Sequence, residues 1–186
     1  ERVDFGYLVS RRFVGESCSL SVMNKRRQVR KVRLPLVRPR PLVVSDPPVP
    51  PPYFSVGGLV FVPLTEQFLL DEFGHHFDQE GPLGLVWHWS EGRRRYEGQE
   101  VIVLSQVLAS PLTVGFTDFY NVALLRFNGK EPKNLQHLIR MVDSCREANL
   151  TFVFERETCI ILPRKKAAAA TPKILKANMI RHDRSV

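Results

Sequence analysis

Apolar and polar residues alternate in the first part of the chain, in the pattern of short, half-buried strands. Residues 17–23 and 29–37 carry apolar side chains at every second position on either side of a turn at Asn24. Residues 5–10 also read as a strand. Because a lone strand pair is at best marginally stable, we expect these strands to be the second half of a small β domain whose first half lies upstream.

Seven prolines between Arg38 and Pro52 interrupt this pattern. Proline fixes φ and removes a backbone donor, so such a segment favours an extended spacer over a helix or a strand. We therefore predict a domain boundary, with a proline-rich linker at 46–52. A ligand for an SH3 or WW domain is the alternative use of such a sequence.

After the linker, the pattern predicts a second domain at residues 53–163. Residues 54–64 read as a strand entered through a Gly-Gly corner, and Thr65 can cap a short helix that ends at Gly74. The near-continuous apolar run at 100–108 indicates a strand that is buried on both faces.

An insertion at about 75–99, polar and rich in glycine and aromatic residues, precedes that last strand. It contains Trp87, Trp89 and three successive arginines. Tryptophans beside basic residues can stack on single-stranded nucleic acid, but so short a segment makes a weak platform. We expect the tryptophans to pack on the parent domain or on a neighbouring subunit.

The last third of the second domain has the strongest local signals. Residues 122–127 form a predicted strand that leads into Asn128-Gly129, a pair that readily adopts the positive φ values of a tight turn. Asn134 is a good helix N-cap, and apolar residues recur at helical spacing through about Ala148. These apolar residues are Leu135, Leu138, Ile139, Val142 and Cys145.

Two further strands, 150–155 and 158–162, are predicted to close the unit and to be joined around Arg156-Glu157. A basic, alanine-rich tail at 164–186 follows, in which Thr171-Pro172 can start a final helix. Strands and helices in one unit predict the α+β fold class.

Basic charge is concentrated in one short segment. The formal net charge is +8, and residues 11–40 contain ten Lys or Arg against one acid. Nucleic-acid binding through this segment is therefore an alternative function, although alternation places the charges on the solvated face of a strand pair, where they would also attract an acidic partner. No apolar run approaches the roughly 18 residues that a membrane span needs.

The sequence offers no strong catalytic or metal-binding constellation. No Gly-x-Ser-x-Gly motif occurs. His75 and His76, with two nearby aspartates, are the one local cluster that a metal could use, but a solvated loop is favoured. The three cysteines, Cys18, Cys145 and Cys159, have no zinc-site spacing, and we expect buried thiols. We predict no metal or cofactor, and no catalysis by this chain alone.

Taken together, these segments resemble the C-terminal PDZ region of plant- or alga-type Deg (protease Do-like, HtrA-family) serine proteases. The order of strand, Asn-Gly turn, capped helix and two strands over 122–155 is how the second half of a PDZ domain reads in HtrA-type proteins. The segments FGYLVSRRF (5–13), GLVFVPLT (58–65), VIVLSQVL (101–108) and ILK (174–176) occur in the same order as in that family. The resemblance covers most of the chain.

The resemblance implies a PDZ-like, partly open β-barrel with a capping helix at 53–163, preceded at 1–45 by the second half of another PDZ domain. It also implies an upstream protease domain, and so a non-catalytic role in a serine endopeptidase of protein quality control. The partners would be other subunits of the protease and, as a second role, peptide or unfolded-protein C-termini. A free-standing PDZ adaptor is the alternative. Relatives occur in chloroplasts, mitochondria and the nucleus, and a plant or algal organelle is favoured.

A PDZ domain binds a peptide C-terminus as an added strand beside a helix, while backbone N–H groups of a glycine-rich loop hold the carboxylate. Leu138 and Val142, with Leu135 and Ile139, would line either the groove or the core. Pro63 removes an N–H from the pairing edge. For the plant-type relatives, the second PDZ domain can instead make contacts between subunits. The matching corner and strand would be Gly57, Gly58, Leu59, Val60 and Phe61.

Overall fold

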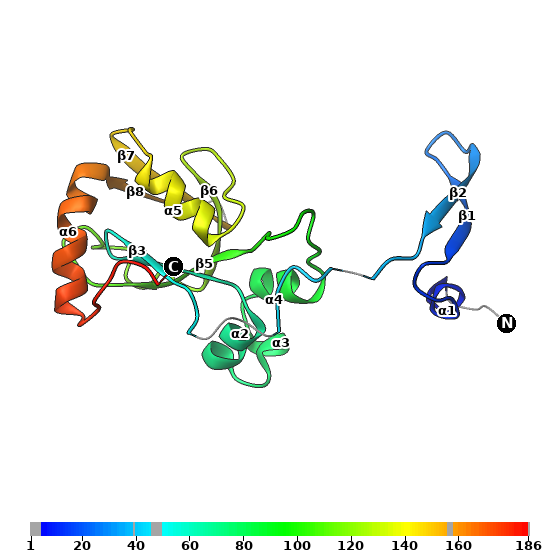
Figure 1. Ribbon diagram of the computed structural model, residues 1–186, viewed down its shortest axis with the longest axis horizontal. Coiled ribbons are helices and arrows are strands. Elements are labelled where there is room, and N and C mark those ends of the chain that lie inside the picture. The colour runs from blue at the N-terminus through cyan, green and yellow to red at the C-terminus, as the bar shows by residue number, and fades with distance from the viewer. Residues whose placement is uncertain (1–4, 39, 46–49, 156–157, 186) are drawn as a thin grey trace. The chain divides into compact units, whose positions relative to one another are not determined.

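The chain divides into two compact units, Glu1–Arg40 (unit 1) and Pro41–Val186 (unit 2) (Figure 1). Most of the predicted linker and the predicted connection at Arg156-Glu157 lie outside the described residues. The structure, a computed structural model, describes residues 5–38, 40–45, 50–155 and 158–185.

Unit 1 contains a strand hairpin. Its strands, β1 (Ser17–Met23) and β2 (Val29–Pro35), pair antiparallel, as the alternating pattern predicted. At the turn, the side-chain oxygen of Asn24 accepts hydrogen bonds from the backbone N–H groups of Arg26 and Gln28. The structure thus confirms both the hairpin and the position of its turn.

The predicted strand at 5–10 is wrong, because these residues form the short helix α1 (Phe5–Ser10). No strand pairs with them within the described part of the chain, so their backbone groups are hydrogen-bonded locally. The hydroxyl of Ser10 donates to the carbonyl oxygen of Tyr7 over 3.1 Å. A strand-like sequence is therefore helical where it has no partner strand.

Unit 2 is built on one six-stranded sheet in which all neighbours pair antiparallel and follow one another in chain order. The mixture of this sheet with helices confirms the α+β class. The strands are β3 (Phe54–Val56), β4 (Leu59–Pro63), β5 (Ile102–Val107), β6 (Val122–Phe127), β7 (Asn149–Phe154) and β8 (Cys159–Pro163).

The single strand expected at 54–64 is in fact two strands, β3 and β4, joined by a tight turn at Gly57-Gly58. The two glycines have φ of +60° and +96°, a region that other residues adopt only at a cost. The chain therefore reverses direction at this corner. The reversal leaves β3 at one edge of the sheet, next to β4, and β8 forms the other edge.

Two helix caps predicted from the sequence are present. The hydroxyl of Thr65 accepts a hydrogen bond from the backbone at the start of α2 (Glu66–Phe73), which ends at Gly74 as predicted. The side-chain oxygen of Asn134 does the same, over 2.8 Å, at the start of α5 (Leu135–Asp143). Both side chains satisfy an N–H that the helix itself leaves unpaired. However, α5 ends before the predicted limit near residue 148.

The final helix, α6 (Arg164–Ala177), begins well before Thr171-Pro172, the predicted start. Four successive alanines at 167–170 explain the difference, because alanine has the highest helix propensity. Pro172 lies inside the helix, and the Thr171 hydroxyl beside it donates to the carbonyl of Ala167. α6 packs on β3 and β8. No helix in the described part of the chain is long and apolar enough to cross a membrane.

The predicted insertion forms two short helices, α3 (Phe77–Glu80) and α4 (Leu83–Ser90). Trp89 packs edge-on against Phe77, with ring centroids 4.9 Å apart, in an apolar cluster that includes residues of the sheet. Trp87, in contrast, is 59% exposed. The insertion is therefore packed on its parent domain through one tryptophan and presents the other at the surface.

Helix α5 covers the main core of unit 2. Leu135, Leu138 and Ile139 are buried on its inner face, as the helical spacing predicted. They join a cluster that includes Phe61 and Phe152, whose rings stack with centroids 5.2 Å apart. Burial of each such side chain stabilises the fold by roughly 1.5–3 kcal/mol. This packing fixes α5 against the sheet.

The cysteines are free thiols that differ in exposure. Cys18 is buried and Cys145 is half-buried. Cys159 is exposed because it occupies an outward-facing position of β8. The expectation of buried thiols is therefore wrong for Cys159.

Candidate functional site

A cleft of about 870 Å³ lies beside β3, between α5 and α6. We call it the β3 cleft. Because β3 is an edge strand of the sheet, one of its backbone edges is not used by β4. The apolar lining of the cleft includes Phe54, Val56, Val142, Leu150 and Leu175, and residues 179–184 form one of its walls.

The chain itself occupies the free edge of β3. Residues 182–185, here called the edge segment, run beside this strand, and Phe54 and Arg184 face each other in an antiparallel bridge (Figure 1). Hydrogen bonds on both sides of such a bridge are the pattern of an antiparallel strand pair. The backbone N–H of Ser55 donates to the carbonyl of Asp183 over 2.6 Å, and that of Ser185 donates to the carbonyl of Tyr53 over 3.2 Å.

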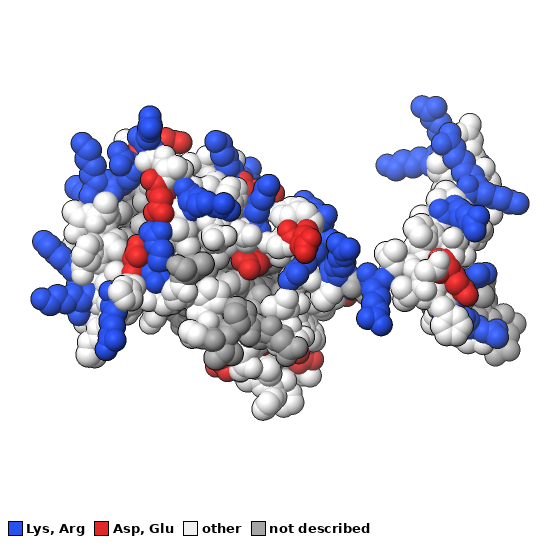
Figure 2. All heavy atoms as spheres, viewed as in Figure 1, with Lys and Arg blue, Asp and Glu red and all other residues white. Residues whose placement is uncertain are grey.

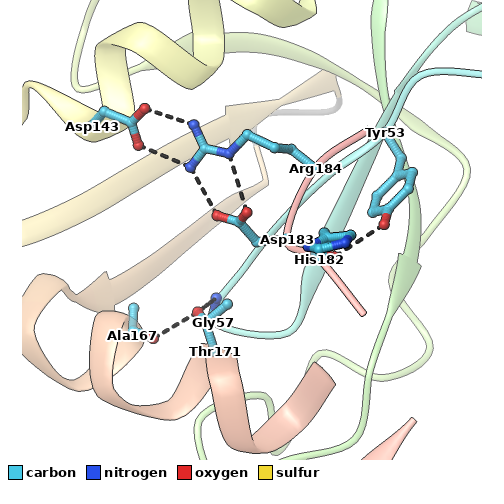
Figure 3. Close-up of polar contacts among 8 residues, drawn as sticks. All are labelled: Tyr53, Gly57, Asp143, Ala167, Thr171, His182, Asp183 and Arg184. Carbon is cyan, nitrogen blue, oxygen red and sulfur yellow. Dashed lines mark hydrogen bonds and ion pairs between the residues drawn. The ribbon is translucent and has the colours of Figure 1, made fainter. Parts of the chain in front are cut away.

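Two contacts of Tyr53 add to this pairing. Its backbone N–H donates to the hydroxyl of Ser185 over 3.0 Å. Its phenol donates to the carbonyl of His182, also over 3.0 Å (Figure 3). The edge segment is therefore held along its whole length, from His182 to Ser185, by the residue that precedes β3 and by β3 itself.

Arg184 joins the edge segment to α5. Its guanidinium donates two hydrogen bonds to Asp143, of 2.7 and 3.1 Å, and two more to Asp183 (Figure 3). It also lies over the ring of Phe54, 5.2 Å from the centroid. These bonds hold the pKa of Arg184 above its ordinary value, the bond to Asp143 first and that to Asp183 second.

The position of Asp143 explains why a cation is favoured here. Asp143 is the last residue of α5, and the C-terminus of a helix carries partial negative charge that disfavours a carboxylate. The positive guanidinium of Arg184 offsets both the charge of the Asp143 carboxylate and the partial negative charge of the helix end. Because the Asp143 side chain is 51% exposed, solvent screens the pair, and its worth is at most about 1 kcal/mol.

The glycine corner predicted to hold a carboxylate is packed under α6. A Cβ on Gly57 would lie 2.7 Å from a methyl of Leu162 and 3.2 Å from Cβ of Ala167. The backbone N–H of Gly57 donates to the Thr171 hydroxyl over 2.8 Å (Figure 3). A Cβ on Gly58 would lie 2.9 Å from the carbonyl of Leu108. Helix α6 therefore already uses the donor of Gly57.

The other predicted site residues are divided between the core and the cleft. Leu59, Phe61 and Leu138 are fully buried in the core. Val60 is half-buried on β4, and β4 is hydrogen-bonded to β3 on one side and to β5 on the other. Val142 lines the β3 cleft. The edge that an added strand could use is therefore on β3, and of these residues only Val142 lies at it.

Sequence reasoning missed Asp143 and the edge segment. Residues 181–185 read Arg-His-Asp-Arg-Ser and have no apolar alternation, which is the signal used for every other strand. Their extended conformation comes from pairing with β3, more than 120 residues earlier in the chain. Only the resemblance to a strand-adding domain pointed to the neighbourhood of β3.

The histidines do not assemble a metal site. His75 and His76 are both exposed, and His76 precedes α3 without forming a side-chain cap. The described residues contain no group of three or more side chains that could hold a metal ion. His137, near the start of α5, accepts a hydrogen bond at Nδ1 from the backbone N–H of Lys133. Its pKa is lowered by burial first, and then by the charges of Arg140 and Lys133.

The basic segment lies on the unit 1 hairpin. Every residue of β2 is exposed, and Figure 2 shows lysine and arginine side chains gathered over this hairpin. Cys18 and Leu20 of β1 lie opposite Leu34 and Val32 of β2, respectively. One face of the hairpin is thus apolar, and Leu34 on that face is 44% exposed.

Comparison with known proteins agrees with these features. Residues 45–186 match the family model described as PDZ domain. Protease Do-like 2, chloroplastic, of Arabidopsis thaliana is 33% identical over this whole chain and 30% of its own length. Putative protease Do-like 11, mitochondrial, of the same plant is 29% identical over 97% of this chain and 28% of its own length. The serine protease DegP homolog of Plasmodium falciparum is 23% identical over 80% of this chain. The chain spans less than a third of the length of these relatives.

Proposed function

The chain belongs to the PDZ domain family, and from this we propose that unit 2 binds extended polypeptide segments by adding them as a strand to β3. In strand addition, main-chain hydrogen bonds supply affinity and side-chain pockets supply selectivity. The observation that carries the proposal is the pairing of β3 with the edge segment, in which Ser55 and Tyr53 each form a backbone hydrogen bond with an extended strand.

The β3 cleft provides the side-chain contacts that such a strand needs. Its apolar lining, which includes Val56 of β3 and Leu175 of α6, can accept every second side chain of a bound extended segment. Of the residues predicted from the sequence, Val142 is the one we propose to touch a ligand. Gly57, Gly58, Leu59, Val60, Phe61 and Leu138 form the scaffold that holds β3 and α5 in place.

We place this activity in a Deg-type serine endopeptidase whose hydrolytic domain lies upstream, in a chloroplast or a mitochondrion. The similarity to protease Do-like proteins over the whole chain supports this. Unit 1 would then complete another PDZ domain together with upstream residues. The exposed apolar face of its hairpin, which includes Leu34, supports that arrangement, because such a face is normally covered.

The experiment compares two substitutions at Ser55. Its N–H points to the free edge of β3, so Ser55→Pro removes the donor there while the pairing with β4 keeps its own donors. Ser55→Ala is the matched control, because the buried Ser55 hydroxyl has no partner among the described residues. The assay is fluorescence anisotropy with labelled decapeptides that end in valine, either with a free C-terminus or amidated.

We expect Ser55→Ala to bind as the unchanged protein does. The edge segment uses the same Ser55 N–H, so Ser55→Pro is measured together with Arg184→Ala, which loosens that segment. The double variant should bind about tenfold more weakly than Arg184→Ala alone, which corresponds to one lost hydrogen bond of about 1.4 kcal/mol. Peptides N-methylated at single positions provide a second measurement that does not depend on folding of the variant. Strand addition predicts that methylation weakens binding at alternate residues only. Equal losses at all positions, or none, would contradict the proposal.

Contacts between subunits are a second candidate function. Leu83 and Trp87 of α4 are 83% and 59% exposed, and residues four apart lie on one face of a helix. Large exposed apolar side chains on one face favour a protein partner. A copy of the same chain is the partner we propose for this face.

A further inference from the structure

The edge segment has the geometry of a bound ligand, although it belongs to the same chain. It pairs antiparallel with β3, lies beside α5, and reaches across the cleft to Asp143. An extended peptide that adds to β3 would need the same backbone groups, because Ser55 and Tyr53 are already hydrogen-bonded to the edge segment. The edge segment and an added peptide therefore cannot bind these backbone groups at the same time.

We infer that the edge segment is a built-in ligand that occupies the free edge of β3 at the β3 cleft, and that this site selects extended segments bearing an arginine opposite Phe54. This inference rests on the proposed function, because it names the regulation and the ligand class of the same site.

Arginine is selected by two groups that face it from different elements. The ring of Phe54 on β3 lies under the guanidinium, and the carboxylate of Asp143 on α5 accepts two hydrogen bonds from it. A planar guanidinium can stack on a ring and bind a carboxylate through two parallel bonds, whereas the ammonium group of lysine is a point charge and cannot do both in this way. We therefore expect arginine to be preferred over lysine.

The edge segment can be displaced because its contacts are polar and partly exposed, and a peptide strand could form them equally well. Apart from the backbone bond to Ser55 of β3 and the contacts of Tyr53, its main link to the body of unit 2 is the partly exposed pair between Arg184 and Asp143. It is tethered to α6 by only four residues, 178–181. Such a short tether gives an effective concentration on the order of 1 mM. A free peptide with an intrinsic Kd of about 0.1 mM would then bind roughly tenfold more weakly to the closed protein.

The test uses the full chain and a fluorescein-labelled peptide with the sequence of residues 180–185, acetylated and amidated. Arg184→Ala removes the link to Asp143 and uncovers the ring of Phe54, while the cleft residues that belong to β3, α5 and α6 keep their side chains. Asp143→Arg breaks the same link but replaces the carboxylate that faces Arg184 with a cation. Asp78→Arg, an exposed carboxylate on α3, is the control for the change in net charge.

We expect the peptide to bind Arg184→Ala about tenfold more tightly than the unchanged protein and Asp78→Arg. In Arg184→Ala, the Ser55 amide should exchange its hydrogen faster when no peptide is present, because its acceptor on Asp183 has left. Asp143→Arg should reject this peptide and accept a version with aspartate in place of its second arginine. A lysine in that place should weaken binding to Arg184→Ala by about fivefold.

The outcomes separate this inference from the proposed function. In one outcome, each peptide binds Arg184→Ala as tightly as it binds the unchanged protein, and the Ser55 amide exchanges at the same rate in both. The cleft then binds peptides, but the edge segment does not compete with them. If the Ser55 amide exchanges faster in Arg184→Ala but no peptide binds, the proposed function itself is wrong. If the aspartate peptide binds Arg184→Ala as well as the arginine peptide does, selection of arginine is refuted.

Discussion

The glycine corner between β3 and β4 allows a quantitative test of how α6 is seated. Gly57→Ala adds a methyl group 2.7 Å from Leu162 and 3.2 Å from Ala167. Both neighbours are buried, so neither can move away freely. Overpacking of this kind costs about 1–3 kcal/mol, and alanine at a φ of +60° adds roughly 1 kcal/mol. We expect a loss of about 3 kcal/mol in the free energy of unfolding of unit 2.

The matched control is Gly129→Ala. Gly129 also has a positive φ, of +76°, but a Cβ there would meet nothing within 4 Å. Only the backbone cost applies, so we expect a loss of about 1 kcal/mol. The assay is urea unfolding followed by tryptophan fluorescence, which reports on unit 2 because both tryptophans of the chain belong to it.

Equal losses for the two variants would refute the reasoning. They would mean that neither Leu162 of β8 nor Ala167 of α6 presses on the corner. A larger loss for Gly57→Ala by about 2 kcal/mol would support close packing of β8 and α6 on that corner.

Two further predictions concern α5 and α4. The pKa of His137 is lowered below its ordinary value of 6.5, so the unfolded chain takes up the proton first, and the free energy of unfolding should fall as the pH drops below about 6.5. His137→Gln should show a smaller fall when urea unfolding is measured between pH 7.5 and 5. Trp87→Ala together with Leu83→Ala should lower the mass seen by light scattering towards that of one chain, whereas Tyr120→Ala, which is also exposed, should leave it unchanged. A mass that does not respond to the α4 pair would remove this helix as a subunit contact.

Features that depend on neighbouring residues were predictable from the sequence. Thr65 and Asn134 each cap a helix by bonding a backbone group three residues on, and the identity of the capping residue is enough to suggest it. The same holds for the turn at Asn128-Gly129, where both residues have positive φ. Alternation found the β1–β2 hairpin for the same reason, since its two strands are adjacent in sequence.

Features that depend on distant partners were missed. The Gly57-Gly58 pair reverses the chain partly because α6, more than 100 residues later, packs against it. Residues 5–10 have the composition of a strand but no strand to pair with in the described part of unit 1, and they are helical. The edge segment has no strand pattern and is extended because β3 offers it an edge. In each case the conformation depends on whether a distant segment packs or pairs with these residues, and the local sequence carries no information about that segment.

The edge of β3 also shows why closure and binding belong together. An unpaired edge strand beside an apolar cleft invites association with other chains, and proteins normally cover such an edge. A permanent cover would be expected to use apolar packing, as α6 does over Gly57. The cover here is instead the polar edge segment, which ends on a partly exposed ion pair between Arg184 and Asp143. A cover attached in this way protects the edge from random partners, yet a segment that offers the same arginine can replace it at little cost. Titrating Arg184→Ala with the peptide therefore tests whether the edge segment competes with ligands. If it does, the loosened protein should bind the peptide more tightly; if it only shields the edge, the peptide should not bind there.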